Sequence, residues 1–350
     1  MKILQLVDSL EIGGAERMAV NMANVLCDFH IENVIVCTRA EGPLISFLPK
    51  NASLFKLDKK SSFDFFAFFK LIQLVRACKP NIIHVHSTSL IWGVLIRIFY
   101  LNAKIVWHDH YGNRKNENNF IIKIFLNFAN GIIAVNQDLL NWARSEFPKK
   151  KSVLIKNFPF LKFEGSFERA KYVIVHLANL KHPKDHLTLV EAVGIAKTKT
   201  EHHFEVWCIG KDFNDAYSDK IKLKIEEGNL TQTIKLLGSV ENTSQLLQHA
   251  RLGVLCSEFE GLPVSLLEYG LAGLPVIVTN VGQCAEVAGN GLYATVVQPS
   301  NPVELAAALV WHITNQPEST RLGLNFKEHV IKEYGSKKFF EDYMKFINAL

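Results

Sequence analysis

The residues best able to do chemistry lie in one short segment, residues 257–268, which reads SEFEGLPVSLLE. It directly follows an apolar run, residues 252–256, that is typical of a buried strand. Gly261 permits a tight turn with the backbone close to a ligand, and Pro263 fits the first turn of a helix, where its missing N–H costs nothing. The free N–H groups at such a helix start form an anion site suited to a diphosphate.

Two carboxylates lie at the start of the expected helix. Glu260 precedes the expected helix, and Glu268 lies one to two turns into it. One carboxylate could therefore reach a sugar while the other accepts hydrogen bonds from ribose hydroxyls. A capping acid plus a solvated helix glutamate remains the alternative, because acids near a helix start are favoured by the helix dipole.

Histidines on two strand-like runs form a second candidate cluster. His84 and His86 alternate along one run and share a face, and His108 and His110 do the same at the end of another. Two such pairs raise the question of a metal. No acidic or cysteine partners accompany them, and a tetrahedral site needs three or four ligands, so we expect no metal.

The elements that must position these residues alternate along the chain, because apolar, β-branched runs are separated by longer helical patterns. This alternation predicts parallel βαβ units, and it breaks once, between residues 157 and 170. We therefore expect an α/β fold of two doubly wound, Rossmann-like domains facing a cleft: residues 1–165, residues 166–335, and a C-terminal helix at 336–350 that packs back towards the first domain. The strands are expected near 2–7, 33–37, 81–85, 104–107, 131–135, 172–177, 204–209, 233–237, 252–256, 275–279 and 293–297.

The composition excludes several classes of protein. The chain has 350 residues, 48% of them hydrophobic, a length at which two domains are expected. Its six cysteines include no C-x-x-C pair, which argues against a zinc site or a disulfide framework. The start, MKILQLVD, is too short and too early charged for a signal peptide, and the longest apolar stretch, 90–101, is broken by Arg97. We expect a cytoplasmic protein with no membrane-spanning segment.

The positive charge and the phenylalanines gather in the N-terminal half. Residues 1–160 carry 20 basic and 12 acidic side chains and 15 of the 24 Phe, five of them within residues 63–69. A basic, aromatic face suits anionic lipid headgroups and would place the protein at the inner face of a membrane as a peripheral protein. The alternative, a buried helix beside solvated lysines, is the one we favour, because aromatic runs are more often core than membrane anchors.

Together these residues resemble the group 1, GT4-type retaining glycosyltransferases of the GT-B fold. The resemblance is carried by the Glu260-x7-Glu268 spacing, the Glu-Gly-Leu-Pro turn, the run AGLPVI at 272–277, and the segment 280–286 that ends on Glu286. It extends over essentially the whole chain, including the two glycines after the first strand and the strand-end His108.

The resemblance implies roles for individual residues. His108 and Glu260 become the catalytic candidates: His108 orients the donor sugar and acceptor, and Glu260 contacts donor-sugar hydroxyls. Lys184 pairs with the donor diphosphate and Glu268 anchors the nucleotide. Asn179 stands where an arginine is usual, and Lys181 is the alternative source of that charge. The full set of expected donor-binding residues is Gly13, Gly14, Asn179, Lys181, Lys184, Gly210, Gly261, Leu262, Pro263, Val264 and Glu268.

The implied reaction moves a hexosyl or N-acetylhexosaminyl group from a UDP- or GDP-sugar to a glycan or polyprenyl-linked acceptor, with retention, in cell-surface polysaccharide biosynthesis. No metal, other cofactor or nucleic-acid partner is expected. The sequence has no Asp-x-Asp triplet and no G-x-x-x-x-G-K-S/T loop, which disfavours metal-dependent sugar transferases and Walker-type ATPases. A nucleotide-sugar 2-epimerase of the same architecture and a non-catalytic nucleotide-sugar-binding partner protein remain alternatives.

Overall fold

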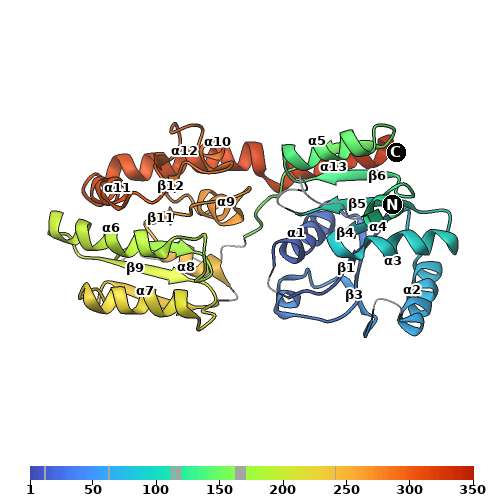
Figure 1. Cartoon of the computed structure of the whole chain (residues 1–350). Coiled ribbons are helices and arrows are strands. Elements are labelled where there is room, and N and C mark those ends of the chain that lie inside the picture. The colour runs from blue at the N-terminus through green and yellow to red at the C-terminus, as the bar shows by residue number, and fades with distance from the viewer. Residues whose placement is uncertain (12, 62–63, 112–113, 115–119, 162–170, 241) are drawn as a thin grey trace. The chain divides into compact units, whose positions relative to one another are not determined.

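The computed structural model describes the chain except residues 12, 62–63, 112–113, 115–119, 162–170 and 241. The described chain divides into two compact units (Figure 1). The N-terminal unit is Met1–Phe158 with Ser336–Leu350, and the C-terminal unit is Pro159–Gly335. The expected domain boundary at 165/166 lies outside the described residues.

The N-terminal unit is built on a parallel sheet of seven strands, in the order β3-β2-β1-β4-β5-β6-β7 among the described residues. Its strands are β1 (Lys2–Val7), β2 (Glu32–Cys37), β3 (Ser53–Lys56), β4 (Ile82–His86), β5 (Lys104–Asp109), β6 (Gly131–Ala134) and β7 (Lys151–Leu154). Its helices are α1 (Gly14–Asp28), η1 (Pro43–Phe47), α2 (Phe65–Cys78), η2 (Ser87–Ser89), α3 (Leu90–Leu95), η3 (Ile96–Ile98), α4 (Phe120–Leu126), α5 (Gln137–Glu146) and α13 (Ser336–Ala349).

The C-terminal unit repeats this plan with a six-stranded parallel sheet, in the order β10-β9-β8-β11-β12-β13 in the described part. The strands are β8 (Tyr172–Leu177), β9 (Phe204–Ile209), β10 (Ile234–Gly238), β11 (Leu252–Leu255), β12 (Val276–Thr279) and β13 (Thr295–Val297). The helices are α6 (His186–Lys199), α7 (Ala216–Glu227), α8 (Thr243–His249), α9 (Val264–Leu271), α10 (Cys284–Val287), α11 (Pro302–Thr314) and α12 (Gln316–Tyr334). The predicted α/β class with two doubly wound sheets is confirmed.

Two strands, β3 and β7, were not predicted, and both lie at the edges of the N-terminal sheet. All four residues of β3 and of β7 are at least partly exposed, and each strand carries a terminal lysine. Central strands of a parallel sheet are covered on both faces and read as continuous apolar runs. These edge strands lack that run, so the pattern used to find the others missed them.

The two faces of the N-terminal sheet differ in polarity. On one face Leu4, Ile83 and Trp107 belong to an apolar core packed against α2, α3 and α4. The other face, at the central strands β1, β4 and β5, carries polar side chains that are fully buried: Gln5, His84, His86 and His108. A buried polar stripe at the centre of a sheet is uncommon and needs internal partners.

The favoured prediction of a buried Phe-rich helix is wrong. The region expected to be that helix forms α2, but Phe65, Phe66 and Phe69 on it are 80%, 88% and 59% exposed. Phe68 alone of the phenylalanines on α2 turns inward, where it packs edge-on against Trp92. Phe63 lies outside the described residues. In the described part of the chain, no helix combines the length and apolarity that crossing a membrane requires.

Candidate functional site

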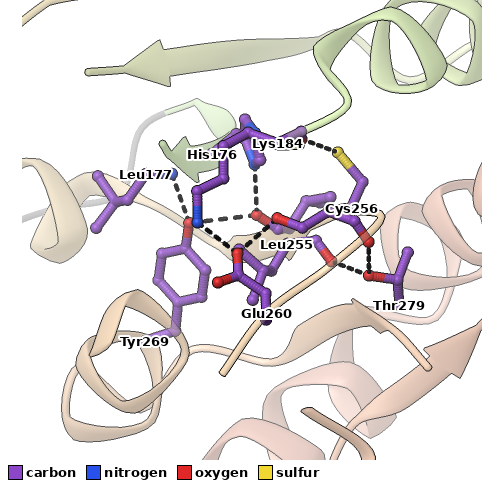
Figure 2. A network of polar contacts seen from close by, with 10 residues as sticks. His176, Leu177, Lys184, Leu255, Cys256, Glu260, Tyr269 and Thr279 are labelled. Carbon is purple, nitrogen blue, oxygen red and sulfur yellow. Dashed lines mark hydrogen bonds and ion pairs between the residues drawn. The ribbon is translucent and has the colours of Figure 1, made fainter. Parts of the chain in front are cut away.

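The carboxyl edge of the C-terminal sheet brings together Lys184, Ser257 and Glu260, of which Figure 2 labels Lys184 and Glu260. Lys184 Nζ lies 2.5 Å from Glu260 Oε1, and Ser257 Oγ donates to the same oxygen at 2.6 Å. Glu260 is only 9% exposed, and the Lys184 side chain is 24% exposed. The second oxygen, Glu260 Oε2, has no hydrogen-bond partner among the described residues, so it is available to a ligand.

Two loops far apart in sequence hold this pair. Lys184 ends the loop after β8, and Asp185 caps α6 by accepting a hydrogen bond from Thr188 N at 3.2 Å. The loop after β11 is tied to it because Glu258 N donates to Pro183 O at 2.8 Å. Because both loops follow neighbouring parallel strands, they meet at one edge of the sheet, where ligands of such folds bind.

Tyr269 of α9 joins β8 and β11 near the pair (Figure 2). Its hydroxyl accepts from Leu177 N at 2.6 Å and donates to Val254 O at 3.2 Å. Thr279 Oγ1 donates to Ser257 O at 2.7 Å, which joins β12 to the same loop. Tyr269 is fully buried, and burial raises the pKa of its hydroxyl well above the ordinary value. These bonds fix the backbone that carries Ser257, and the Ser257 hydroxyl in turn fixes the Glu260 carboxylate.

The start of α9 offers free backbone donors beside Glu260. Its N-cap is Pro263, and no side chain of the described residues caps the first turn, whereas α6 is capped by Asp185. Uncapped N–H groups at a helix start favour an anion. Glu268 lies on the same helix, buried at 9% exposure and already engaged with a partner. Of the other expected contacts, Leu262 is partly buried against the core, Pro263 is buried and Val264 is half-buried.

Of the two glycines near Glu260, the structure requires a glycine at only one position. Gly261 has no atom within 4 Å of where a Cβ would lie, so nothing in the described chain requires a glycine there. Gly282 has φ +51°, and its Cβ would lie 1.9 Å from the carbonyl oxygen of Glu260. The loop after β12 therefore supports the backbone of Glu260 by direct contact. Neither Ser257 nor Gly282 had an expected role, although Ser257 lies three residues before Glu260, in the loop after β11.

The expected residues of the β8 loop have separate partners. Asn179 Oδ1 accepts a hydrogen bond from Lys211 N at 2.8 Å. Lys181 is exposed, and its ammonium lies 6.0 Å from the Phe213 ring centre, so it has a different neighbour from Lys184. A Cβ on Gly210 would lie 2.1 Å from Ala178 O, so this glycine allows β9 to approach the loop backbone.

In the N-terminal unit, the two glycines do open a helix. Gly13 is the N-cap of α1 without a side-chain cap, and Gly14 is its first residue, with open space where a Cβ would lie. A Cβ on Gly13 would meet only the flexible carboxylate of Glu16. The start of α1 resembles that of α9 in leaving its first N–H groups to an external partner.

The histidines of the N-terminal unit form two hydrogen-bonded pairs. His84 Nε2 lies 3.1 Å from His108 Nδ1, and His86 Nδ1 lies 3.0 Å from His110 Nε2. His86 Nε2 is bonded to Gln5 Oε1 at 2.8 Å. Within the described part of the chain, His108 Nε2 and His110 Nδ1 have no hydrogen-bond partner. His108, the residue expected to orient the sugar, is fully buried, so contact with a substrate needs a local movement of the chain that covers it.

This cluster is the obvious place to look for a metal. Potential ligand atoms of His84, His86 and His108 lie within 4.8 Å of one another. Both nitrogens of His84 and of His86 are already bonded within the protein, to Tyr343, His108, His110 and Gln5. A three-histidine site would have to break these bonds. The arrangement fits a hydrogen-bond network better than a metal site.

Burial keeps the cluster neutral. It lowers the pKa of His84 and of His110 to about 3, with a smaller contribution from His110 to the pKa of His84. The pKa values of His86 and His108 fall well below the ordinary value for the same first cause. None of these rings therefore carries a proton charge near neutral pH, and each has one donor and one acceptor nitrogen.

These buried histidines should make folding sensitive to acid. In the C-terminal unit burial also lowers the pKa of His176 to about 4 and of His312 to about 4. The unfolded chain takes up protons near pH 6.5, whereas the native state does not, so stability is fully present above that pH and is lost as pH falls below it. We expect a loss of about 1.4 kcal/mol per pH unit for each such histidine, measured as the urea midpoint between pH 7.5 and 5.

A matched pair of variants checks this prediction. His312→Gln, which keeps hydrogen-bonding capacity towards Thr295 and Ser319, should reduce the pH slope. The exposed His202→Gln should leave it unchanged. A urea midpoint that stays constant or rises from pH 7.5 to 5 would contradict the prediction.

Two family models match the chain and together span residues 12–329. The model described as "Glycosyltransferase Family 4" matches residues 12–158, and the one described as "Glycosyl transferases group 1" matches residues 157–329. The break between the two models coincides with the division between the two units at Phe158.

Curated relatives align with most of the chain. The "Capsular polysaccharide biosynthesis glycosyltransferase CapH" of Staphylococcus aureus is 26% identical over 308 residues, which covers 82% of this chain and 83% of that protein. The "GalNAc-alpha-(1->4)-GalNAc-alpha-(1->3)-diNAcBac-PP-undecaprenol alpha-1,4-N-acetyl-D-galactosaminyltransferase" of Campylobacter jejuni is 25% identical over 282 residues, covering 77% of this chain and 76% of that protein.

Solved structures resemble the chain over its full length. Anabaena HepE, crystallised with UDP and glucose, has a TM-score of 0.79 at 18% identity, with 100% of both chains covered. The sucrose-phosphate synthase of Thermosynechococcus elongatus has a TM-score of 0.73 at 15% identity, again with 100% of both chains covered. At such low identity these likenesses concern the fold alone.

Proposed function

Because the chain belongs to the group 1, GT4-type glycosyltransferases, an enzyme family of the GT-B fold, we propose that it moves a hexosyl or N-acetylhexosaminyl group from a nucleotide-diphosphate sugar to a glycan or polyprenyl-linked acceptor, with retention of configuration. Its relatives are glycosyltransferases, several of them of polysaccharide biosynthesis. The donor, the stereochemistry and the acceptor are the parts that we propose.

One observation carries the donor assignment: Lys184 and Glu260 meet beside the uncapped start of α9. In our proposal the diphosphate takes the place of Glu260 at the Lys184 ammonium and accepts hydrogen bonds from the first turn of α9. Phosphate oxygens bind both kinds of donor well. Glu260, freed from Lys184, then turns its carboxylate to the hydroxyls of the donor sugar, and Glu268 anchors the nucleotide.

The leaving diphosphate would be stabilised by these groups without a metal. Departure of the nucleotide builds negative charge on the diphosphate, and a fixed ammonium plus helix N–H groups stabilise that charge electrostatically. A bound divalent cation performs the same task in other enzymes. We therefore propose a metal-independent reaction with a UDP- or GDP-sugar, to be tested with EDTA present throughout. HepE, which has a similar fold, was crystallised with UDP and glucose, which makes a UDP-sugar the first donor to try.

A product assay separates this function from its alternatives. The chain is incubated with a nucleotide sugar, with and without a lipid-linked or oligosaccharide acceptor, and the products are examined by NMR. Transfer predicts an acceptor-dependent product with the anomeric configuration of the donor. A changed donor without any acceptor indicates a 2-epimerase, and binding without turnover of any donor indicates a non-catalytic partner.

The acceptor proposal gains support from an apolar, basic surface on the N-terminal unit, which we call the helical-layer surface. It covers α2, α3 with η3, and α4, which lie next to one another (Figure 1). Ten large hydrophobic side chains are exposed on it or at its ends: Phe65, Phe66, Phe69, Ile98, Phe99, Leu101, Phe120, Ile121, Ile124 and Phe128.

The basic side chains of this surface favour an anionic membrane as its binding partner. Residues 65–108 contain five basic side chains and no Asp or Glu: Lys70, Arg76, Lys79, Arg97 and Lys104. Lys123 on α4 is paired with Glu146. Exposed aromatic side chains with basic ones between them suit an anionic bilayer. In our proposal this surface holds the enzyme at the membrane that carries a polyprenyl-linked acceptor. The related C. jejuni transferase is named for an undecaprenol-linked substrate.

Vesicle binding tests the membrane contact. The triple variant Phe65→Ser, Phe66→Ser, Phe69→Ser should lose binding to phosphatidylglycerol vesicles by tenfold or more, since about 0.8 kcal/mol is lost for each CH₂ withdrawn from the bilayer. Leu324→Ser with Ile331→Ser, which removes exposed apolar side chains of the C-terminal unit, is the control and should bind like the wild type. Equal binding of all three proteins, or none to anionic vesicles, would refute the contact.

A further inference from the structure

A chain of hydrogen bonds links the C-terminal helix to His108. The Tyr343 hydroxyl on α13 lies 3.2 Å from His84 Nδ1, and His84 Nε2 lies 3.1 Å from His108 Nδ1. At the far end, His108 Nε2 has no hydrogen-bond partner among the described residues. All three side chains are fully buried, so solvent supplies no substitute partner.

Only two proton arrangements keep both hydrogen bonds. In the first, the Tyr343 hydroxyl donates to His84, His84 Nε2–H donates to His108, and His108 carries its own hydrogen on Nε2. In the second, every donor is reversed: His108 Nδ1–H donates to His84, and His84 Nδ1–H donates to the Tyr343 oxygen. Neutral imidazole has one N–H, so the state of one ring dictates the state of the next.

Counting unpaired groups selects between the two arrangements. The first leaves one buried group unpaired, His108 Nε2–H. The second leaves two, because the lone pair of His108 Nε2 and the hydroxyl hydrogen of Tyr343 both lack partners. His84 is the only partner that the described chain gives the Tyr343 hydroxyl. A buried polar group without a partner is costly, so the first arrangement is favoured.

We propose that Tyr343 is a positioning residue: through His84 it fixes His108 as the tautomer with hydrogen on Nε2, so that His108 meets its ligand as a hydrogen-bond donor and not as a base. The proposal rests on the proposed function, in which that ligand is a sugar oxygen. A hydrogen-bond donor at this position would orient a sugar hydroxyl or stabilise negative charge developing on an oxygen.

Packing holds Tyr343, the first residue of this series of hydrogen bonds, in a fixed position. Its ring stacks on Phe339 of the same helix with centroids 5.9 Å apart, and Phe339 packs on Phe158 at 4.5 Å. Burial raises the pKa of the Tyr343 hydroxyl and lowers that of His84 to about 3, so both groups stay neutral and keep their protons near pH 7. Although Tyr343 and His84 are 259 residues apart, α13 belongs to the same unit as β4 and β5.

Histidine-selective ¹⁵N NMR reads the tautomer directly in the full-length protein, with the His108 signal assigned from its loss in His108→Gln. The wild type should show His108 protonated on Nε2 alone. Tyr343→Phe, which removes only the hydroxyl, should produce a detectable Nδ1–H population at His108 and lower the rate of sugar transfer by about tenfold, with the donor KM little changed. Phe339→Leu is the control for packing: it should lower the unfolding temperature without altering the tautomer.

A wild-type His108 protonated on Nδ1 would overturn the proposal, and so would a tautomer that Tyr343→Phe leaves unchanged. The NMR result does not depend on activity. If the wild-type chain transfers no sugar at all, the proposed function fails while the role of Tyr343 in setting the tautomer is still decided by the spectra.

Discussion

Glu260→Gln and Lys184→Gln are expected to affect donor binding and turnover in different ways. In the structure, Glu260 Oε1 lies 2.5 Å from the Lys184 ammonium, where in our account the diphosphate binds. Removing the carboxylate charge removes a competitor, so Glu260→Gln should bind the nucleoside diphosphate as well as the wild type or a few-fold better. Its transfer rate should fall by about 100- to 1000-fold, the loss typical of one electrostatic contact to the transition state.

Lys184→Gln should instead lose binding. A charge-assisted hydrogen bond to phosphate contributes about 1.5–3 kcal/mol, so the affinity should drop by roughly 10- to 150-fold. Both variants are measured by calorimetric titration with the nucleoside diphosphate and by single-turnover transfer. Lys211→Gln, at an exposed lysine near the same loop, is the matched control and should change neither. If Glu260→Gln turned over at the wild-type rate, our assignment of Glu260 would be wrong.

Gly282→Ala is expected to inactivate the enzyme from a position that contacts no ligand in our account. The new Cβ would lie 1.9 Å from Glu260 O, at a backbone φ of +51° that side chains rarely adopt. The loop must move, and Glu260 moves with it. Strain of this kind costs about 1–3 kcal/mol of stability, and a misplacement of about 1 Å can cost about 100-fold in rate. Urea unfolding and transfer assays measure the two effects.

Gly273→Ala separates backbone strain from displacement of Glu260. Gly273 has φ +68°, yet its Cβ would meet only Lys327 Cδ at 3.5 Å. It should lose a similar part of the stability through strain while keeping most of the transfer rate. Gly261→Ala, with open space and an ordinary φ, should leave stability unchanged. If Gly273→Ala lost as much transfer activity as Gly282→Ala, the effect would come from general destabilisation, not from Glu260.

The central strands and the donor segment were predictable from the sequence because their signals are local. Buried parallel strands read as apolar runs, and the Glu-Gly-Leu-Pro turn lies directly after one of them. The edge strands β3 and β7 gave no such run, since their side chains are partly exposed. The helix α2 was expected to be buried because it is apolar, but hydrophobicity alone does not tell which face of an apolar helix meets a core.

The supporting residues of the site could not be found from spacing. Gly282 matters because it touches a backbone 22 residues earlier in the sequence, and the role of Tyr343 depends on α13 packing beside β4. The pairing of Lys184 with Glu260 is likewise a tertiary contact, although each residue was singled out separately. Long-range contacts of single atoms leave no pattern in a sequence. Residues at strand ends can be found because the apolar run of the buried strand shows where the strand ends.

The most direct test of the central claim is the thermal stability of the chain with UDP, GDP, ADP and their common sugar conjugates, all in excess EDTA. A ligand that binds the native state raises its stability by about 2.7 kcal/mol at a hundredfold excess over Kd. The account predicts that one nucleotide series raises the unfolding temperature in EDTA and that Lys184→Gln abolishes the rise. A response to none of them, or one that appears only when a divalent metal is restored, would contradict it.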